Sequence, residues 1–99
     1  GRMSADVARL VEQVVRTREE LTEALADPDL PADRARYAAV NKRWSDLAEA
    51  FELAARWEDA AGRAAEAEEL LADGGDDDVR ELLRDAREEM EDLAPRIRE

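Results

Sequence analysis

The side chains that most enzymes use for chemistry are sparse in this chain of 99 residues. It contains no histidine and no cysteine, which excludes Ser–His and Cys–His nucleophiles. Its hydroxyl groups belong to Ser4, Thr17, Thr22, Tyr37 and Ser45. Carboxylates are abundant, but acid–base catalysis needs two of them in different environments of one pocket. Adjacent pairs such as Glu68–Glu69 point in different directions on a solvated helix, so we expect no catalytic residue and no enzyme.

Two short motifs resemble ligand sites only in part. Asp76-Asp77-Asp78 lacks the spaced oxygens and the distal glutamate of a calcium loop. We predict that one of these aspartates caps a helix within a solvated turn. Gly74-Gly75 lacks the Lys-Ser/Thr of a phosphate loop and suits a left-handed helix end instead. We therefore predict no metal site and no cofactor.

Four of the 15 basic residues form the one basic cluster of the sequence, near the start of the expected second helix. They are Arg34, Arg36, Lys42 and Arg43. Such a cluster usually pairs with the acidic groups around it, which is our interpretation here. The alternative is contact with phosphate, for which this is the one suitable patch in the sequence.

The aromatic residues Tyr37, Trp44 and Phe51 follow one another at seven-residue spacing. At heptad spacing we predict that they belong to the core, with a partner-binding groove as the alternative. As a core residue, Trp44 replaced by alanine would cost about 3–5 kcal/mol. Trp57 is out of this phase, and we expect it to be partly exposed. The residues that contact a partner are otherwise unknown from the sequence.

The net charge is −12 and is unevenly distributed. Residues 1–65 contain 13 acidic and 10 basic residues, a balance of −3, whereas residues 66–99 contain 14 acidic and 5 basic residues, a balance of −9. A surface this negative repels phosphate, which disfavours direct binding of nucleic acid. A basic protein surface is the partner that this charge favours. No apolar run reaches the roughly 20 residues of a membrane span, and the absence of cysteine fits the cytoplasmic location that we expect.

Hydrophobic periodicity predicts three helices separated by two turns. The first spans about 5–26, with Ser4 as its N-cap, and ends before Pro28. The second opens at Asp33 and continues to about Leu71 as one long helix, with Gly62 tolerated inside it or breaking it. The third spans about 78–93, and Pro95 ends or kinks it.

Helix lengths then determine the expected architecture, an all-α, elongated three-helix antiparallel bundle with a long, coiled-coil-like middle helix. The middle helix would be about 60 Å long and its neighbours about 30 Å each. Short turns make both neighbours antiparallel to it, so the first helix covers its N-terminal half and the third its C-terminal half. All three would overlap near Trp44 to Trp57. The alanines of Ala60–Ala67 allow the third helix a close approach.

Several motifs, taken in order, resemble one known family. They are the turn Leu25–Asp29, Arg36-Tyr37, Lys42-Arg43-Trp44, Ser45-Asp46-Leu47, Trp57-Glu58-Asp59, Ala67–Leu71 and Leu83–Glu89. In this order and spacing, the chain resembles the N-terminal helical domain of bacterial class I peptide chain release factors, of the group-one type. Residues 1–2 are interpreted as a tag remnant. Residues 3–99 are expected to form a single helical domain, the N-terminal fragment of a longer factor.

The resemblance implies a non-catalytic role in translation termination. It implies docking on the ribosome at the stalk base, near the GTPase-associated centre and its L11-type protein, and a position near the recycling GTPase. The Pro-x-Thr and Gly-Gly-Gln motifs of the later domains do not occur in this sequence. The alternative is a stand-alone acidic bundle that binds a partner helix or dimerises, since long heptad-bearing helices commonly self-associate.

Overall fold

The structure, a computed structural model, describes residues 2–99, with side chains from residue 5 onward. Four α-helices and one 3-10 turn make up this part of the chain, which contains no strand. They are α1 (Arg2–Ala26), η1 (Leu30–Ala32), α2 (Arg34–Asp46), α3 (Ala48–Ala72) and α4 (Asp77–Arg98). The prediction of an elongated all-α bundle is confirmed, with extents of 57 × 26 × 18 Å.

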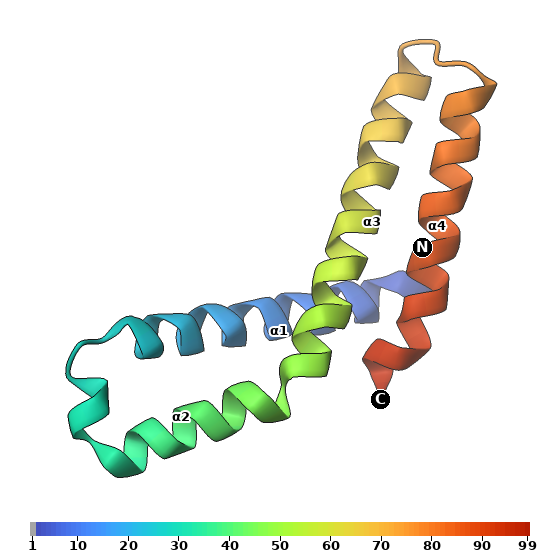
Figure 1. Ribbon diagram of the computed structural model, residues 1–99. Coiled ribbons are helices and arrows are strands. Elements are labelled where there is room, and N and C mark those ends of the chain that lie inside the picture. The colour runs from blue at the N-terminus through green and yellow to red at the C-terminus, as the bar shows by residue number, and fades with distance from the viewer. Residues whose placement is uncertain (1) are drawn as a thin grey trace.

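Two helical hairpins meet at an angle, as Figure 1 shows. The α1–α2 hairpin (residues 2–46) runs across the base of the α3–α4 hairpin (residues 48–98). The first helix covers both α2 and the base of α3–α4, because it packs against α2, α3 and α4. The antiparallel arrangement of neighbours that we predicted from the short turns is therefore present.

The prediction of a single long middle helix is wrong. A break falls at Leu47, whose backbone lies at φ −99° and ψ 4°, and not at Gly62, which lies inside α3. Two hydrogen bonds of helical spacing cross the break: Leu47 N–H donates to Arg43 O at 3.0 Å, and Phe51 N–H donates to Leu47 O at 2.9 Å. Because of the break, α2 packs along α1 and α3 packs along α4. The two helices therefore have different axes.

Local sequence explains the turn between α1 and α2. As predicted, α1 ends at Ala26, ahead of Pro28. Asp33, where we expected the second helix to open, caps α2 by accepting a hydrogen bond from Arg36 N–H at 3.0 Å. The side chain of Leu30, at 1% exposure, anchors the turn in the interior. We did not foresee this anchor, because an apolar residue between two prolines gives no periodic signal.

The second turn, between α3 and α4, follows helix-end chemistry as predicted. Gly74 adopts φ +93°, the left-handed conformation that glycine accepts without steric cost. Its N–H donates to Leu71 O at 3.1 Å, and Gly75 N–H donates to Leu70 O at 2.8 Å, the paired hydrogen bonds of a Schellman motif. Asp76 then caps α4 through Oδ1, which accepts from the N–H groups of Asp78 and Val79.

Two clusters of buried residues form the core. The first lies where α1 crosses the base of α3–α4 and consists of Val7, Val11, Leu53, Ala54, Trp57 and Leu93. The second lies farther along the α3–α4 hairpin and consists of Ala64, Ala67, Leu83 and Ala86. The three-helix overlap is therefore centred on Leu53–Trp57, and Trp44 lies outside it. The small side chains bring α3 and α4 close together, as the alanine run predicted.

The predicted start of the first helix and the predicted end of the last helix both need correction. The first helix begins at Arg2, so Ser4 lies inside it and is not its N-cap. Pro95 lies inside α4, which continues to Arg98. Tertiary contacts hold this last turn in place, because Ile97 packs against the first core cluster and Arg98 pairs with Asp6.

Candidate docking surfaces

The aromatic residues are arranged differently from the predicted seam. Phe51 is buried, and Trp44 is half-buried with its ring centroid 5.1 Å from that of Phe51. Tyr37 is 44% exposed, so its assignment to the core is wrong. Trp57 is only 9% exposed and belongs to the first core cluster, so the expectation of partial exposure is also wrong. Helix α3 packs against both α4 and α1, so its buried face is wide enough to include Trp57 as well as Phe51. Helix α2 has fewer neighbours and no buried residue, which leaves Tyr37 at the surface.

Helix α2 contains no buried residue, since it lies along α1 and otherwise touches only η1 and the start of α3. Its basic cluster is partly engaged: Arg36 Nη1 lies 3.5 Å from Asp27 Oδ2, and Lys42 Nζ lies 2.7 Å from Asp46 Oδ2. The hydrogen bond and charge of Asp46 raise the pKa of Lys42. Among the described side chains, Arg34 and Arg43 have no ion-pair partner. Two of the four basic residues are therefore paired with acidic groups, as predicted, and the other two are not.

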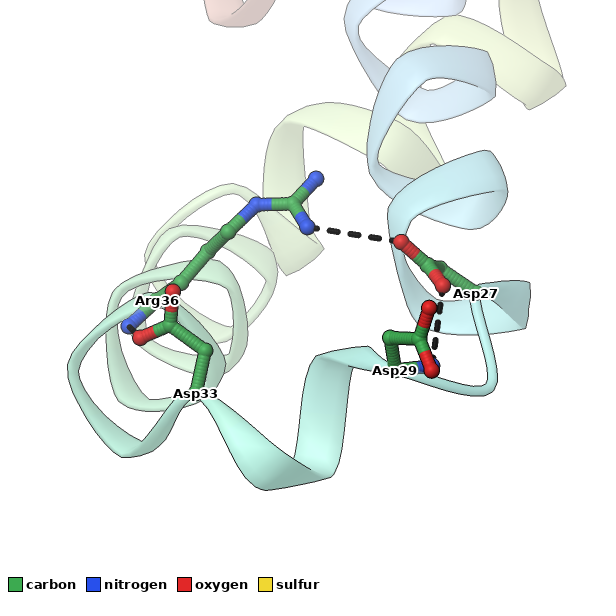
Figure 2. A network of polar contacts seen from close by, with 4 residues as sticks. All are labelled: Asp27, Asp29, Asp33 and Arg36. Atoms are coloured by element: carbon green, nitrogen blue, oxygen red, sulfur yellow. Dashed lines mark hydrogen bonds and ion pairs between the residues drawn. The ribbon is translucent and has the colours of Figure 1, made fainter.

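Figure 2 shows that the carboxylates beside this cluster have structural roles. Asp27 Oδ1 accepts from the Asp29 N–H at 2.9 Å, while its Oδ2 faces Arg36. Asp33 Oδ1 accepts from the Arg36 N–H. These contacts hold the turn between α1 and α2. Across the described side chains, no three carboxylates are placed to hold a metal ion.

The charge of the molecule is concentrated on the α3–α4 hairpin. It contains 17 acidic and seven basic residues, whereas α2 has four basic residues and one acidic residue. Six of the seven basic residues are in ion pairs: Arg63, Arg80, Arg84, Arg87, Arg96 and Arg98. Within the described part of the chain, ten of the 17 carboxylates have no ion-pair partner. The hairpin therefore presents a strongly negative surface that internal pairing does not neutralise.

Leucines provide the other exposed feature of this hairpin. Leu70 is 53% exposed and Leu82 is 62% exposed. Each directly precedes a leucine that packs in the second core cluster, Leu71 or Leu83. The apolar residues of α4 follow one another at steps of three and four and form a seam that packs in the two core clusters: Val79, Leu83, Ala86, Met90, Leu93 and Ile97. That seam leaves Leu82 outside the core, which is the sequence signal that could have identified it. None of the described helices is long and apolar enough to cross a membrane.

Fold and surface together define an all-α, acidic helical-hairpin domain. A model of the PCRF domain matches residues 14–99. Three relatives are each named peptide chain release factor 1. That of Ligilactobacillus salivarius is 34% identical over 67 residues, which is 68% of this chain and 19% of the relative. That of Cytophaga hutchinsonii is 33% identical over 76 residues, 77% of this chain and 20% of the relative. That of Flavobacterium psychrophilum is 30% identical over 81 residues, 82% of this chain and 23% of the relative.

The chain belongs to the PCRF domain family. Over most of its length it is similar to the N-terminal helical domain of class I peptide chain release factors, as the sequence motifs indicated. It spans about a fifth of the length of the curated relatives it matches. No solved structure matches the chain significantly.

Proposed function

We propose that this domain is the non-catalytic N-terminal part of a cytoplasmic peptide chain release factor, and that it docks the factor at the ribosomal stalk base. The observation that carries the proposal is the acidic α3–α4 hairpin, which projects away from α1 and has ten unpaired carboxylates among its described residues. A long negative arm fits a basic ribosomal protein, in particular the L11-type protein of the stalk base. The recycling GTPase is a second partner that the resemblance suggests.

Electrostatics supports a protein as the direct contact of this arm. Each unpaired carboxylate repels RNA phosphates. A protein surface rich in lysine and arginine instead attracts the carboxylates and speeds its association with the hairpin. The attraction reaches about 30 Å at 0.01 M salt but only about 8 Å at 0.15 M. Binding through the hairpin should therefore be strongly sensitive to salt.

The chemistry of peptide release is assigned to other domains of the factor. The decoding and hydrolysis motifs that the resemblance implies, Pro-x-Thr and Gly-Gly-Gln, do not occur in this chain. Continuation of the genomic reading frame into a Gly-Gly-Gln-bearing domain would support the proposal. A stop codon directly after Glu99 would support a stand-alone protein instead.

The test is binding of the 99-residue chain to the isolated stalk-base protein at low and physiological salt. The hairpin variant replaces Glu69, Glu88 and Glu91 with glutamine, and the matched control replaces Glu12, Glu19 and Glu23 on α1. All six side chains are exposed. We expect the hairpin variant to weaken binding about tenfold at low salt and the control to have a smaller effect. Equal effects, or no binding by the native chain, would contradict the proposal.

The second candidate function is self-association, as a stand-alone helical interaction or dimerisation module. The exposed leucines of the α3–α4 hairpin favour it, because exposed apolar groups on a helix pair commonly meet a partner. Sedimentation over a range of protein concentration distinguishes the two functions. A dimer that forms at micromolar concentration, together with failure to bind the stalk-base protein, would favour self-association.

A further inference from the structure

Leu70 and Leu82 are the two most exposed large hydrophobic side chains among residues 5–99. A single exposed leucine on a protein surface is ordinary. Two of them on one face of a hairpin would form an apolar patch, which is more informative. Whether they share a face follows from the register of α3 and α4.

An ion pair defines that register. Arg63 Nη2 on α3 lies 2.6 Å from Glu89 Oε2 on α4, so these two side chains meet across the hairpin on one of its faces. Seven residues are two helical turns and return to nearly the same face. The helices are antiparallel, so the direction toward the turn is forward along α3 and backward along α4. Seven residues after Arg63 is Leu70, and seven residues before Glu89 is Leu82. The two leucines therefore lie opposite each other, on the face of the Arg63–Glu89 pair and nearer the turn.

Carboxylates bracket both leucines in the same way. Residues four before and three after a helical residue are its neighbours on the same face. For Leu70 these are Glu66 and Asp73, and for Leu82 they are Asp78 and Asp85. Asp85 is 3.5 Å from Arg84, while the other three have no ion-pair partner among the described side chains. The patch thus has an apolar centre and an acidic rim.

The turn holds this patch in a fixed shape. The hydrogen bond from Gly75 N–H to Leu70 O, and the left-handed Gly74, tie the end of α3 to the connection with α4. Leu71 and Leu83, adjacent to the two exposed leucines, are anchored in the second core cluster. A pre-organised surface of this kind loses little conformational entropy when a partner binds.

We propose that Leu70 and Leu82, with their rim of four carboxylates, form a docking site for a basic protein surface that presents an apolar side chain. An apolar centre surrounded by a charged rim is the usual anatomy of a protein interface. Charge complementarity selects the occupant: a second copy of this hairpin would bring two acidic rims together, and a nucleic acid would place phosphates against them. The inference rests on the proposed function and locates its contact on the outer part of the hairpin.

The test compares a double variant, Leu70→Gln with Leu82→Gln, with the matched control Leu25→Gln. Leu25 is also an exposed leucine, in the last turn of α1. Figure 1 shows that this end of α1 lies away from the α3–α4 turn. Glutamine removes the apolar group without changing charge or helix propensity greatly, and circular dichroism checks that each variant folds. The probe is the isolated stalk-base protein. We expect the double variant to weaken binding at least tenfold, as loss of central contacts does, and the control to bind like the native chain.

A rim variant separates the two parts of the site. Replacing Glu66 with glutamine and Asp78 with asparagine should reduce the salt dependence of binding, whereas the double leucine variant should leave that dependence unchanged. If the native chain binds and the double leucine variant binds equally well, the inference is overturned and the proposed function stands. If the native chain does not bind the stalk-base protein, both are overturned. If the native chain dimerises and the leucine variant does not, the occupant is a second copy and the inference is overturned.

Discussion

Arg98, at the end of α4, holds Asp6 near the start of α1 with two hydrogen bonds. Arg98 Nε donates to Asp6 Oδ2 at 2.9 Å, and Nη2 donates to Oδ1 at 3.0 Å. Fork-shaped pairing of this kind fixes orientation as well as distance. It places the first turns of α1 against the base of the α3–α4 hairpin, next to Val7 and Leu93 of the first core cluster.

The Asp6–Arg98 pair makes stability depend on pH in a definite direction. The hydrogen bond and charge of Arg98 lower the pKa of Asp6 below its ordinary value of 3.8, although desolvation partly opposes the shift. Because the folded-state pKa is depressed, the stabilisation is present above the unfolded-state pKa and is lost as pH falls through the folded-state pKa. We predict that Asp6→Asn lowers the free energy of unfolding near neutral pH, and that this difference shrinks below about pH 5.

The measurement is urea unfolding of the native chain and Asp6→Asn between pH 2 and pH 7. A double-mutant cycle with Arg98→Gln serves as the control, because the coupling energy of the two residues should decrease toward the acid end of the range. A difference between native and Asp6→Asn proteins that is independent of pH would show that Asp6 acts without its charge.

The two tryptophans differ in how deeply they are buried. Trp57 packs in the first core cluster with Val7, Val11 and Leu93, so we predict that Trp57→Ala costs about 3–5 kcal/mol. The larger loss that we first expected for Trp44→Ala moves to Trp57, because Trp44 is half-buried and its aromatic contact is with Phe51 alone. Trp44→Ala should cost about 1–2 kcal/mol. Chemical denaturation ranks the two variants, and equal losses would place Trp44 in the core after all.

Short-range features of the fold could be predicted from the sequence, and the break at Leu47 could not. The end of α1 before Pro28, the cap at Asp33 and the left-handed Gly74 each depend on a few neighbouring residues. The break has no proline or glycine at it, and it arises because α2 packs on α1 and α3 packs on α4. Such a choice of partner is a tertiary property that heptad phase does not contain.

The candidate site shows the same division. The negative charge of residues 66–99 was evident from composition, and it is this segment that forms most of the acidic hairpin. The pairing of Leu70 with Leu82 was not foreseen, because it depends on the register between two helices. That register is set by where the turn at Gly74 and Gly75 ends α3 and where Asp76 starts α4.

Replacement of glycine by alanine should have opposite effects on stability at Gly62 and at Gly74. Gly62 lies inside α3, and a Cβ atom there would meet nothing within 4 Å. Gly62→Ala should therefore stabilise the protein by about 0.5–1 kcal/mol. Gly74→Ala should destabilise it by about 1–2 kcal/mol, because φ +93° is costly for a residue with a Cβ atom. Thermal unfolding measures both; a stabilising Gly74→Ala would mean that the turn adopts another conformation in solution.

Close packing of α3 on α4 depends on the small side chain of Ala86. This residue is fully buried in the second core cluster with Ala64, Ala67 and Leu83. A leucine at position 86 has no space between the helices, so Ala86→Leu should lower the free energy of unfolding by about 1–3 kcal/mol. Ala65→Leu is the matched control: the same change on the exposed side of α3 should alter stability by less than about 0.5 kcal/mol. Equal stability of the two variants in urea would show that the helices are not in close contact at Ala86.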